Sequence, residues 1–352
     1  MQYRILQVID TLDIGGAEKV TLILANLLAQ KGNDTGLLTI VDGGKLIQKI
    51  NGKVKLFNLN RRSKWHINTA LNFMRIVSHY DLIHVHLRHN LKWILFWSII
   101  LRKKLNIVFH DHSNTILKWN LLYYVQSCNI SHIIVNKILY ASQSPTNLLF
   151  SHVYFLENVI NPVHPLEEYV SKEDELSIVV VSNLRRLKNL EFAIKLANYF
   201  AKRKKITLDI YYAHFEKRYL EELIGLSKKS DIQIEVNFIK GKIEPQLFYH
   251  KYDFALHPSI CESGPLTILE YMAHGLPFIS YNTGQSIALV REKYPEFIAS
   301  SFNMEEWISK LELILDRGRL YYNLLMRDLF SQHCSLDNYY TECKKIYKEN
   351  LA

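Results

Sequence analysis

The sequence has few of the residues that cross-link small secreted proteins or bind structural zinc. Four cysteines occur in 352 residues, and no two of them form a C-x-x-C pair; they are Cys128, Cys261, Cys334 and Cys343. This pattern argues against a disulfide framework and a structural zinc site, and it favours a reduced, cytoplasmic protein. The N-terminus leads directly into an apolar stretch typical of a strand, so we expect no signal peptide.

Long apolar runs are also missing. The longest covers residues 93–101, whereas a helix needs about 20 apolar residues to span a bilayer. Basic residues flank this run, Arg88 and Lys92 before it and residues 102–104 after it. Two interpretations stay open: a buried helix of an α/β domain, and a helix that lies in a membrane interface.

Acidic residues are scarce in the first part of the chain. Residues 1–150 carry 18 Lys and Arg against 7 Asp and Glu, a net charge of +11, and the rest of the chain carries −2. This asymmetry favours an anionic partner such as anionic lipid, a polyprenyl phosphate or nucleic acid, or it reflects solvated lysines that have no partner. Because no aromatic-basic RNA motif accompanies the charge, we expect no nucleic-acid partner.

The chain does contain an alternation of apolar strands with helices of apolar periodicity. We expect strands at 3–9, 35–41, 82–86, 107–110, 131–136, 177–181, 207–212, 234–239 and 254–256, with helices at 19–30, 189–202, 217–227 and 245–249. Such alternation predicts βαβ units with parallel sheets, here in two Rossmann-like α/β halves. The predicted boundaries are 1–165, a polar linker 166–176, a second domain 177–330, and a C-terminal helix within 331–352 that packs back on the first domain.

The most informative motif is a pair of carboxylates, Glu262 and Glu270, on either side of a Gly-Pro turn. Gly264 allows close approach of a ligand to the backbone, and Pro265 suits the first position of a helix. We expect that helix to run over 266–274 and to end at Gly275. Its N-terminus can bind a diphosphate, while the carboxylates can bind a polyol; a capped surface helix is the alternative.

Three further clusters follow predicted strands, where ligands sit in open α/β sheets. Gly15 and Gly16 follow the first strand, and they indicate either a phosphate at a helix N-terminus or only a tight turn. Arg185 and Lys188, three residues apart at a strand-to-helix turn, can clamp two phosphates, or they form a solvated helix start. The third cluster consists of histidines, at His84, His86, His110 and His112.

The histidines have three possible roles. In an H-x-H pair on a strand, both side chains share one face, so a metal site, a polar role at a ligand and a structural role all remain open. No D-x-D motif accompanies them in the sequence. We expect no metal site and no metal requirement.

Together these motifs resemble glycosyltransferase family 4, the retaining enzymes of the GT-B fold that use nucleotide sugars. The resemblance covers nearly the whole chain: residues 14–19, 81–86, 108–112, 184–189, 253–259, the Glu262 to Glu270 block with Ala273, Gly275 and Pro277, and 283–284. It implies two Rossmann-like domains whose parallel sheets face each other across a cleft.

The resemblance also implies roles for individual residues. Glu270 matches the ribose-binding glutamate, Glu262 the one beside the transferred sugar, and His110 the histidine near the reacting carbon. Catalytic roles are expected for His110, Glu262, Arg185 and Lys188; donor binding for Gly15, Gly16, Arg185, Lys188, Ser263, Gly264, Pro265, Leu266, Thr267 and Glu270; and acceptor binding for Glu18, His84, His86 and His112. The sequence departs from the family at Asn183, which occupies the position of a family arginine. We expect Arg185 to take over the role of that arginine.

The predicted activity is transfer of a hexose-type sugar, with retention, from a nucleotide diphosphate donor, a UDP-sugar, to a glycan or lipid-linked glycan. We expect this reaction in bacterial polysaccharide, lipopolysaccharide or capsule synthesis, with no cofactor and with peripheral contact at an anionic membrane, the inner face of the plasma membrane. The alternatives are a GT-B enzyme with a soluble acceptor and a non-catalytic module that binds nucleotide sugars.

Overall fold

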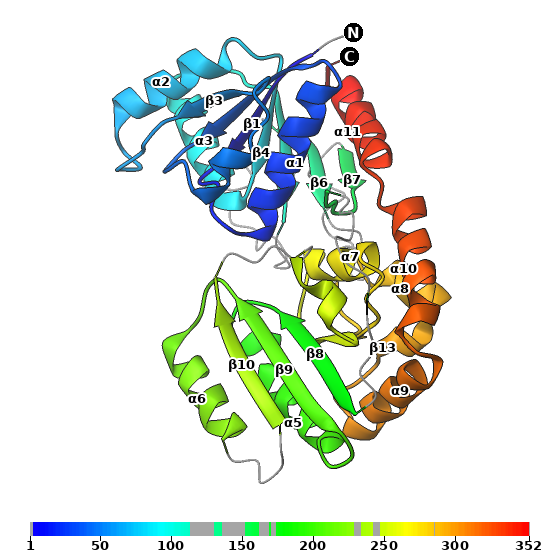
Figure 1. Cartoon of the computed structure of the whole chain (residues 1–352). Helices are drawn as coiled ribbons and strands as arrows, with labels where there is room; N and C mark the ends of the chain where they lie inside the picture. The colour runs from blue at the N-terminus through cyan, green and yellow to red at the C-terminus, as the bar shows by residue number, and fades with distance from the viewer. Residues whose placement is uncertain are drawn as a thin grey trace. The chain divides into compact units, whose positions relative to one another are not determined.

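The chain forms two compact α/β units (Figure 1). The computed structural model describes residues 3–112, 130–135, 152–161, 169, 174–228, 234–241, 247–284 and 286–351. The first unit comprises Met1–Asn161 and Leu336–Ala352, and the second comprises Pro162–Ser335. Each unit has its own parallel sheet, so the predicted architecture of two Rossmann-like α/β halves is confirmed.

The sheet of the first unit has the strand order β3-β2-β1-β4-β5-β6-β7, with parallel pairing between all neighbours. Its strands are β1 (Arg4–Ile9), β2 (Asp34–Thr39), β3 (Lys55–Asn58), β4 (Leu82–His86), β5 (Ile107–Asp111), β6 (Ile130–Val135) and β7 (His152–Phe155). Its helices are α1 (Gly16–Gln30), α2 (Ile67–Val77), α3 (Arg88–Ile100) and α11 (Leu336–Leu351), with a 3-10 turn η1 (Lys45–Lys49).

The two faces of this sheet differ in chemistry because successive side chains on a strand point to opposite sides. On one face, Leu6, Val85 and Phe109 pack against α2 and α3 in an apolar core. This core buries most of the apolar run at 93–101, including Trp93 and Trp97, so the run is part of a packed helix. The other face packs against α1 through residues such as Ile9 and Leu37, and it also carries buried polar side chains.

The sheet of the second unit has the order β10-β9-β8-β11-β12-β13 and is also parallel. Its strands are β8 (Glu175–Val181), β9 (Lys205–Tyr212), β10 (Ile234–Lys240), β11 (Phe254–His257), β12 (Phe278–Tyr281) and β13 (Ile298–Ala299). Its helices are α5 (Leu190–Phe200), α6 (Lys217–Ser227), α7 (Leu266–Ala273), α8 (Ala288–Lys293), α9 (Met304–Arg317) and α10 (Arg319–His333), with 3-10 turns η4 (Arg186–Lys188), η6 (Tyr249–Lys251) and η7 (Pro295–Phe297).

Several boundaries differ from the sequence-based expectations. The strand β8 begins at Glu175, inside the stretch expected as a linker, and the first unit ends at Asn161. The helix α10 continues to His333, past residue 331, and α11 then starts a separate element that contacts α1 and β6 within the first unit. The helix expected at 245–249 lies partly outside the described residues, and the described part leads into the 3-10 turn η6.

Among the described residues, every helix is too short or too polar to cross a membrane. Within these residues no disulfide involves Cys261, Cys334 or Cys343; Cys128 lies outside them.

Candidate active site

The loop between β11 and α7 carries Glu262, and α7 itself carries Glu270. Pro265 is the N-cap of α7 with an extended backbone, one residue earlier than the first helical position expected for it. The helix ends as predicted at Gly275, whose φ of +60° is the left-handed conformation that glycine adopts without strain. The amides of Gly275 and Leu276 donate to the carbonyls of Met272 and Tyr271, which is the Schellman motif.

Gly284 packs directly against this loop. Its φ is +85°, and a Cβ atom there would lie 2.7 Å from Cδ of Pro265 and 3.1 Å from Cβ of Glu262. The hydroxyl of Thr283 accepts a hydrogen bond of 2.9 Å from the amide of Glu262. The loop 262–265 is therefore held in place by the segment that follows β12, which brings Ser263, Gly264, Leu266 and Thr267 to the N-terminus of α7.

The carboxyl group of Glu262 contacts two basic side chains. Its side chain is 13% exposed, Lys188 Nζ is hydrogen-bonded to its Oε1, and His257 Nε2 lies 3.5 Å from the same oxygen. Burial acts to raise the pKa of Glu262, but the hydrogen bond and charge of His257 and the charge of Lys188 outweigh it and lower the pKa to about 2. Glu262 is therefore an anion at neutral pH.

His257 belongs to this site although no sequence motif identified it. It is the last residue of β11, where it pairs in register with Ser280 of β12. Its Nδ1 lies 3.1 Å from Oγ of Ser280, and that hydroxyl donates to the carbonyl of Tyr281. Ser280 Oγ therefore accepts from Nδ1–H, which fixes the ring and directs Nε2 at Glu262. The only signal in the sequence is a polar residue at the end of a buried strand.

Glu270 lies one to two turns inside α7 and is 7% exposed. The buried hydroxyl of Tyr249 lies 3.4 Å from its Oε2, and Nδ1 of His274 lies 2.7 Å from its backbone oxygen. Burial, followed by the charge of Glu270, raises the pKa of Tyr249 well above its ordinary value, so Tyr249 keeps the proton that it donates. The carboxylate of Glu270 is therefore contacted by Tyr249, and its backbone carbonyl is contacted by His274.

The turn after β8 brings one of the two predicted cations to Glu262. Lys188 ends η4 and contacts Glu262, whereas Arg185 precedes η4 and is exposed. Between them, Arg186 turns to the surface, where it pairs with Glu222. Asn183 Oδ1 accepts a hydrogen bond of 2.9 Å from the amide of His214, so this residue joins two loops.

In the first unit, Gly15 is the N-cap of α1, and Gly16 starts the helix. The carboxylate of Glu18 folds back over this N-terminus, and a Cβ on Gly15 would lie 2.1 Å from Glu18 Oε2. A negative charge in the first turn complements the helix dipole. Glu18, the predicted acceptor residue, thus lies directly against Gly15, one of the predicted phosphate-binding glycines.

The four histidines form a buried polar layer on the sheet face opposite α2 and α3. His86 and His110 are paired in register on β4 and β5, and His84 lies two residues before His86. The rings of His110 and His112 stack with centroids 4.0 Å apart, and those of His84 and His86 with centroids 4.4 Å apart. His84, His86 and His110 are 1% exposed or less. The structure thus brings the predicted acceptor histidines and His110 together.

A chain of hydrogen bonds connects this polar layer to the C-terminal helix α11. His112 Nε2 lies 2.9 Å from His86 Nδ1, and His86 Nε2 lies 2.8 Å from Gln7 Oε1. The amide of Gln7 donates to the hydroxyl of Tyr347 over 3.4 Å, and that hydroxyl lies 2.6 Å from His84 Nδ1. The sequence motifs missed Gln7 and Tyr347; the only signal for Gln7 was a polar residue inside an apolar strand.

Comparisons with known proteins agree on the family of the chain. A model of glycosyltransferase family 4 matches residues 14–140, and a model of glycosyl transferases group 1 matches residues 166–325. An uncharacterized glycosyltransferase of Haemophilus influenzae is 24% identical over 345 residues, which cover 94% of this chain and 96% of that protein.

Two solved structures share the fold over nearly the full length. A glycosyltransferase of Rickettsia africae superposes with a TM-score of 0.77 at 16% identity, covering 99% of each chain. HepE of Anabaena, solved in complex with UDP-glucose, superposes with a TM-score of 0.75 at 17% identity, covering 99% of this chain and 100% of HepE. With a family 4 segment followed by a group 1 segment on the GT-B fold, this chain belongs to the glycosyltransferases.

Proposed function

We propose that the protein transfers a hexose-type sugar, with retention of configuration, from a UDP-sugar to a hydroxyl group of a glycan or lipid-linked glycan. The observation that carries this proposal is the ionised Glu262, held by Lys188 and His257 beside the N-terminus of α7. A helix N-terminus favours a diphosphate, and an anionic carboxylate accepts hydrogen bonds from sugar hydroxyls. The complex of HepE with UDP-glucose supports a uridine donor.

In the proposed reaction, the bond between the anomeric carbon and the diphosphate oxygen breaks while a new bond to the acceptor oxygen forms on the same face. The acceptor proton passes to the departing diphosphate, and no covalent sugar–enzyme intermediate forms. Arg185 and Lys188 stabilise the negative charge that grows on the diphosphate, and the amides at the start of α7 add to this effect. Glu270 accepts hydrogen bonds from the ribose. His110 supports the sugar, as the family resemblance implies.

A screen of nucleotide sugars tests this proposal. Wild-type protein is incubated with UDP-, GDP- and ADP-sugars in EDTA, and donor turnover is measured with and without acceptor. We expect turnover of a UDP-sugar in EDTA, because Arg185 and Lys188 supply the positive charge that a divalent ion supplies elsewhere. Glu270→Ala should weaken donor binding by about 10- to 100-fold, since a charge-assisted hydrogen bond contributes about 1.5–3 kcal/mol.

Four results of this screen would count against the proposal or a part of it. Binding of no nucleotide sugar would argue against the enzyme, and binding without turnover would favour a non-catalytic module. Loss of turnover in EDTA, restored by Mg²⁺ or Mn²⁺, would show that a metal is required. Turnover with soluble sugars alone would favour the soluble-acceptor alternative.

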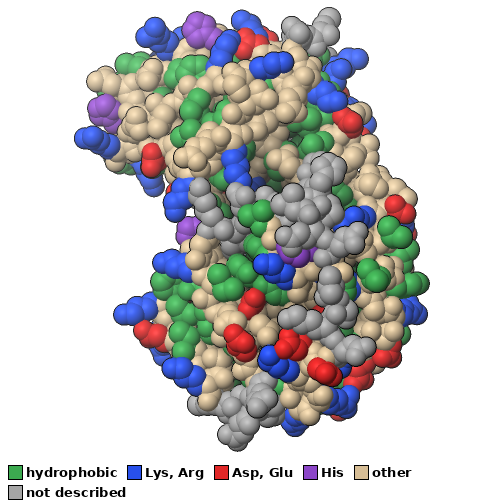
Figure 2. All heavy atoms as spheres, viewed as in Figure 1, with side chains coloured by type: hydrophobic (Ala, Val, Ile, Leu, Met, Phe, Trp, Pro, Cys, Tyr) green, Lys and Arg blue, Asp and Glu red, His purple; other side chains and the backbone are tan. Residues whose placement is uncertain are grey.

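We further propose that the first unit docks on an anionic membrane through an apolar-basic surface. Its apolar members are Trp65, Ile67, Leu71, Ile99 and Ile100, each 45–72% exposed. The exposed basic members are Arg62, Lys64, Arg75, Arg102, Lys103 and Lys104. The ring of Trp65 contacts Phe96 of α3, and Leu71, Arg75, Lys103 and Lys104 line one cavity of about 570 Å³, so these four members lie next to one another. Figure 2 shows Lys and Arg side chains on the first unit, in the upper part of the picture.

Flotation with vesicles tests this surface. We expect wild-type protein to float with vesicles that contain anionic lipid at low salt and to dissociate at high salt, because each Lys or Arg near the membrane contributes about 1 kcal/mol. Replacing Trp65, Ile67 and Leu71 with Ser should abolish flotation. Replacing Leu320 and Leu324, exposed apolar residues of the second unit, with Ser is the control, which should float normally. Absence of binding at low salt would contradict a membrane-bound acceptor.

A further inference from the structure

The polar layer of the first unit contains buried nitrogen atoms that lack hydrogen-bond partners. Within the described part of the chain, Nδ1 and Nε2 of His110 and Nε2 of His84 have none. His110 is 1% exposed and His84 is fully buried. Leaving a buried polar group unsatisfied costs about 1–3 kcal/mol, so three such atoms in one cluster call for a physical reason.

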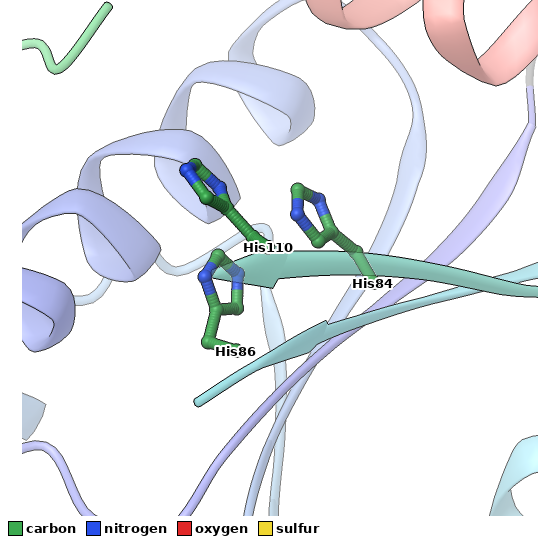
Figure 3. A group of neighbouring side chains, drawn as sticks. All are labelled: His84, His86 and His110. Atoms are coloured by element: carbon green, nitrogen blue, oxygen red, sulfur yellow. The ribbon is translucent and has the colours of Figure 1, made fainter. Parts of the chain in front are cut away.

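These atoms lie close to one another on rigid elements. One ring nitrogen from each of His84, His86 and His110 lies within 4.8 Å of the other two. Figure 3 shows the three rings together on β4 and β5. A tetrahedral zinc ion with Zn–N bonds of about 2.1 Å holds its ligand nitrogens about 3.4 Å apart. The rings of His84 and His110 are tilted by 16° to each other and must rotate to converge on an ion. Rotation of side chains is sufficient, since the strands already supply the spacing.

The chemistry of the cluster suits a transition metal. All three imidazoles are buried, and burial disfavours their protonated, charged forms. Neutral imidazoles offer lone pairs to an ion without first releasing a proton. Three imidazole ligands favour Zn²⁺, Cu²⁺ or Ni²⁺ over Mg²⁺ and Ca²⁺, which prefer oxygen ligands.

Two neighbouring side chains can hold the ligands in position. Ligand histidines in metal sites usually donate their second N–H to another group of the protein. Gln7 Oε1 already lies 2.8 Å from Nε2 of His86, and the hydroxyl of Tyr347 lies 2.6 Å from Nδ1 of His84. These contacts leave Nδ1 of His86 and Nε2 of His84 as the ligand atoms. His86 would exchange its hydrogen bond with His112 for the ion.

Contrary to the sequence-based expectation of no metal site, we propose that His84, His86 and His110 form a binding site for a divalent transition-metal ion of the Zn²⁺ class, with the fourth coordination position left to a non-protein ligand. The ion is not needed for sugar transfer. Resting on the proposed function, we also infer that it inhibits transfer, because it occupies a nitrogen of His110. The site is thus a point at which free zinc can regulate the enzyme.

Titration of the metal-free full-length protein with Co²⁺, followed by visible absorption, tests binding directly. Co²⁺ in a tetrahedral site of nitrogen ligands gives intense visible bands, and added Zn²⁺ should displace it and remove them. We expect one equivalent to bind. His84→Gln and His110→Gln should each weaken binding by more than about tenfold, whereas His79→Gln, which changes an exposed histidine of the same unit, should bind as the wild type does.

The proposal can be tested even if the histidine variants do not fold. If circular dichroism shows that they do not fold, Tyr347→Phe retains the ring, removes the hydroxyl beside His84 and should weaken binding by about 10- to 100-fold. Absence of tetrahedral bands in the wild type, or unchanged affinity in the folded variants, would overturn the site. Binding of Co²⁺ with no zinc inhibition of donor turnover would refute only the regulatory part, and an inactive protein that binds Co²⁺ would refute only the proposed function.

Discussion

Glu262→Gln is expected to lower kcat by about 100- to 1,000-fold, the range seen when one preorganised electrostatic contact to a transition state is removed. The amide keeps the size of the side chain but cannot carry the negative charge that Lys188 and His257 surround. It also leaves the ammonium group of Lys188 without its buried partner. Initial rates over a range of donor concentrations separate the loss in kcat from any change in KM.

A matched control for this variant is Glu222→Gln in the same unit. Glu222 also pairs with basic residues, Arg186 and Arg218, but on the surface, where ion pairs contribute about 0–1 kcal/mol. Its kcat should therefore stay within about threefold of the wild type. Equal losses in both variants would mean that Glu262 has only a structural role.

The pH dependence of unfolding adds a second measurement for Glu262. Since the folded state lowers the pKa of Glu262 from 4.5 to about 2, its ionised form stabilises the folded state at pH values above 4.5. The stabilisation decreases as the pH falls toward 2. The difference in Tm between the wild type and Glu262→Gln should therefore be constant from about pH 8 to 6 and should shrink in acid.

The sequence predicted those parts of the site that depend on neighbours along the chain. Pro265 and Gly275 mark the ends of α7 through their own backbone preferences, and the observed ends lie within one residue of the expected ones. The predicted bounds of β4 were also correct at both ends, because residues 82–86 are apolar at every second position and are followed by a polar loop. Local signals of this kind do not require knowledge of the tertiary structure.

Contacts between distant segments were not predictable in the same way. His257 contacts Glu262 because β11 pairs with β12 in a register that places the Ser280 hydroxyl beside Nδ1 of the ring. Tyr347 reaches His84 across 263 positions of the sequence, once α11 packs on the first unit. Neither contact follows from periodicity or spacing. The roles of His257 and Tyr347 could therefore be identified only from the tertiary structure, although each is a polar residue in a mainly apolar environment.

Arg185→Met and Lys188→Met are both expected to lower kcat by about 100-fold or more, with the larger loss at Lys188. Both cations are proposed to stabilise the departing diphosphate, and Lys188 also holds Glu262. Arg185 is exposed, so its replacement should leave Tm unchanged and report on catalysis alone. Donor kinetics and thermal unfolding are measured on both variants.

Arg186→Met is the matched control for this turn. Arg186 lies between the two cations, but its guanidinium pairs with Glu222 and stacks over Tyr219. It should therefore contribute little to catalysis, and its variant should retain most of the wild-type kcat. A large loss of kcat in Arg186→Met with none in Arg185→Met would show that Arg186, and not Arg185, contacts the diphosphate.

A double-mutant cycle separates the two roles of Lys188. If Lys188 acts mainly by orienting Glu262, Lys188→Met should have little effect once Glu262 is Gln, because the partner is already gone. If it acts mainly on the diphosphate, the losses should multiply. We expect an intermediate result, with a coupling of about 1–3 kcal/mol, since the ammonium group can contact Oε1 of Glu262 and a phosphate oxygen at once. Full additivity would mean that the ion pair seen here has no part in catalysis.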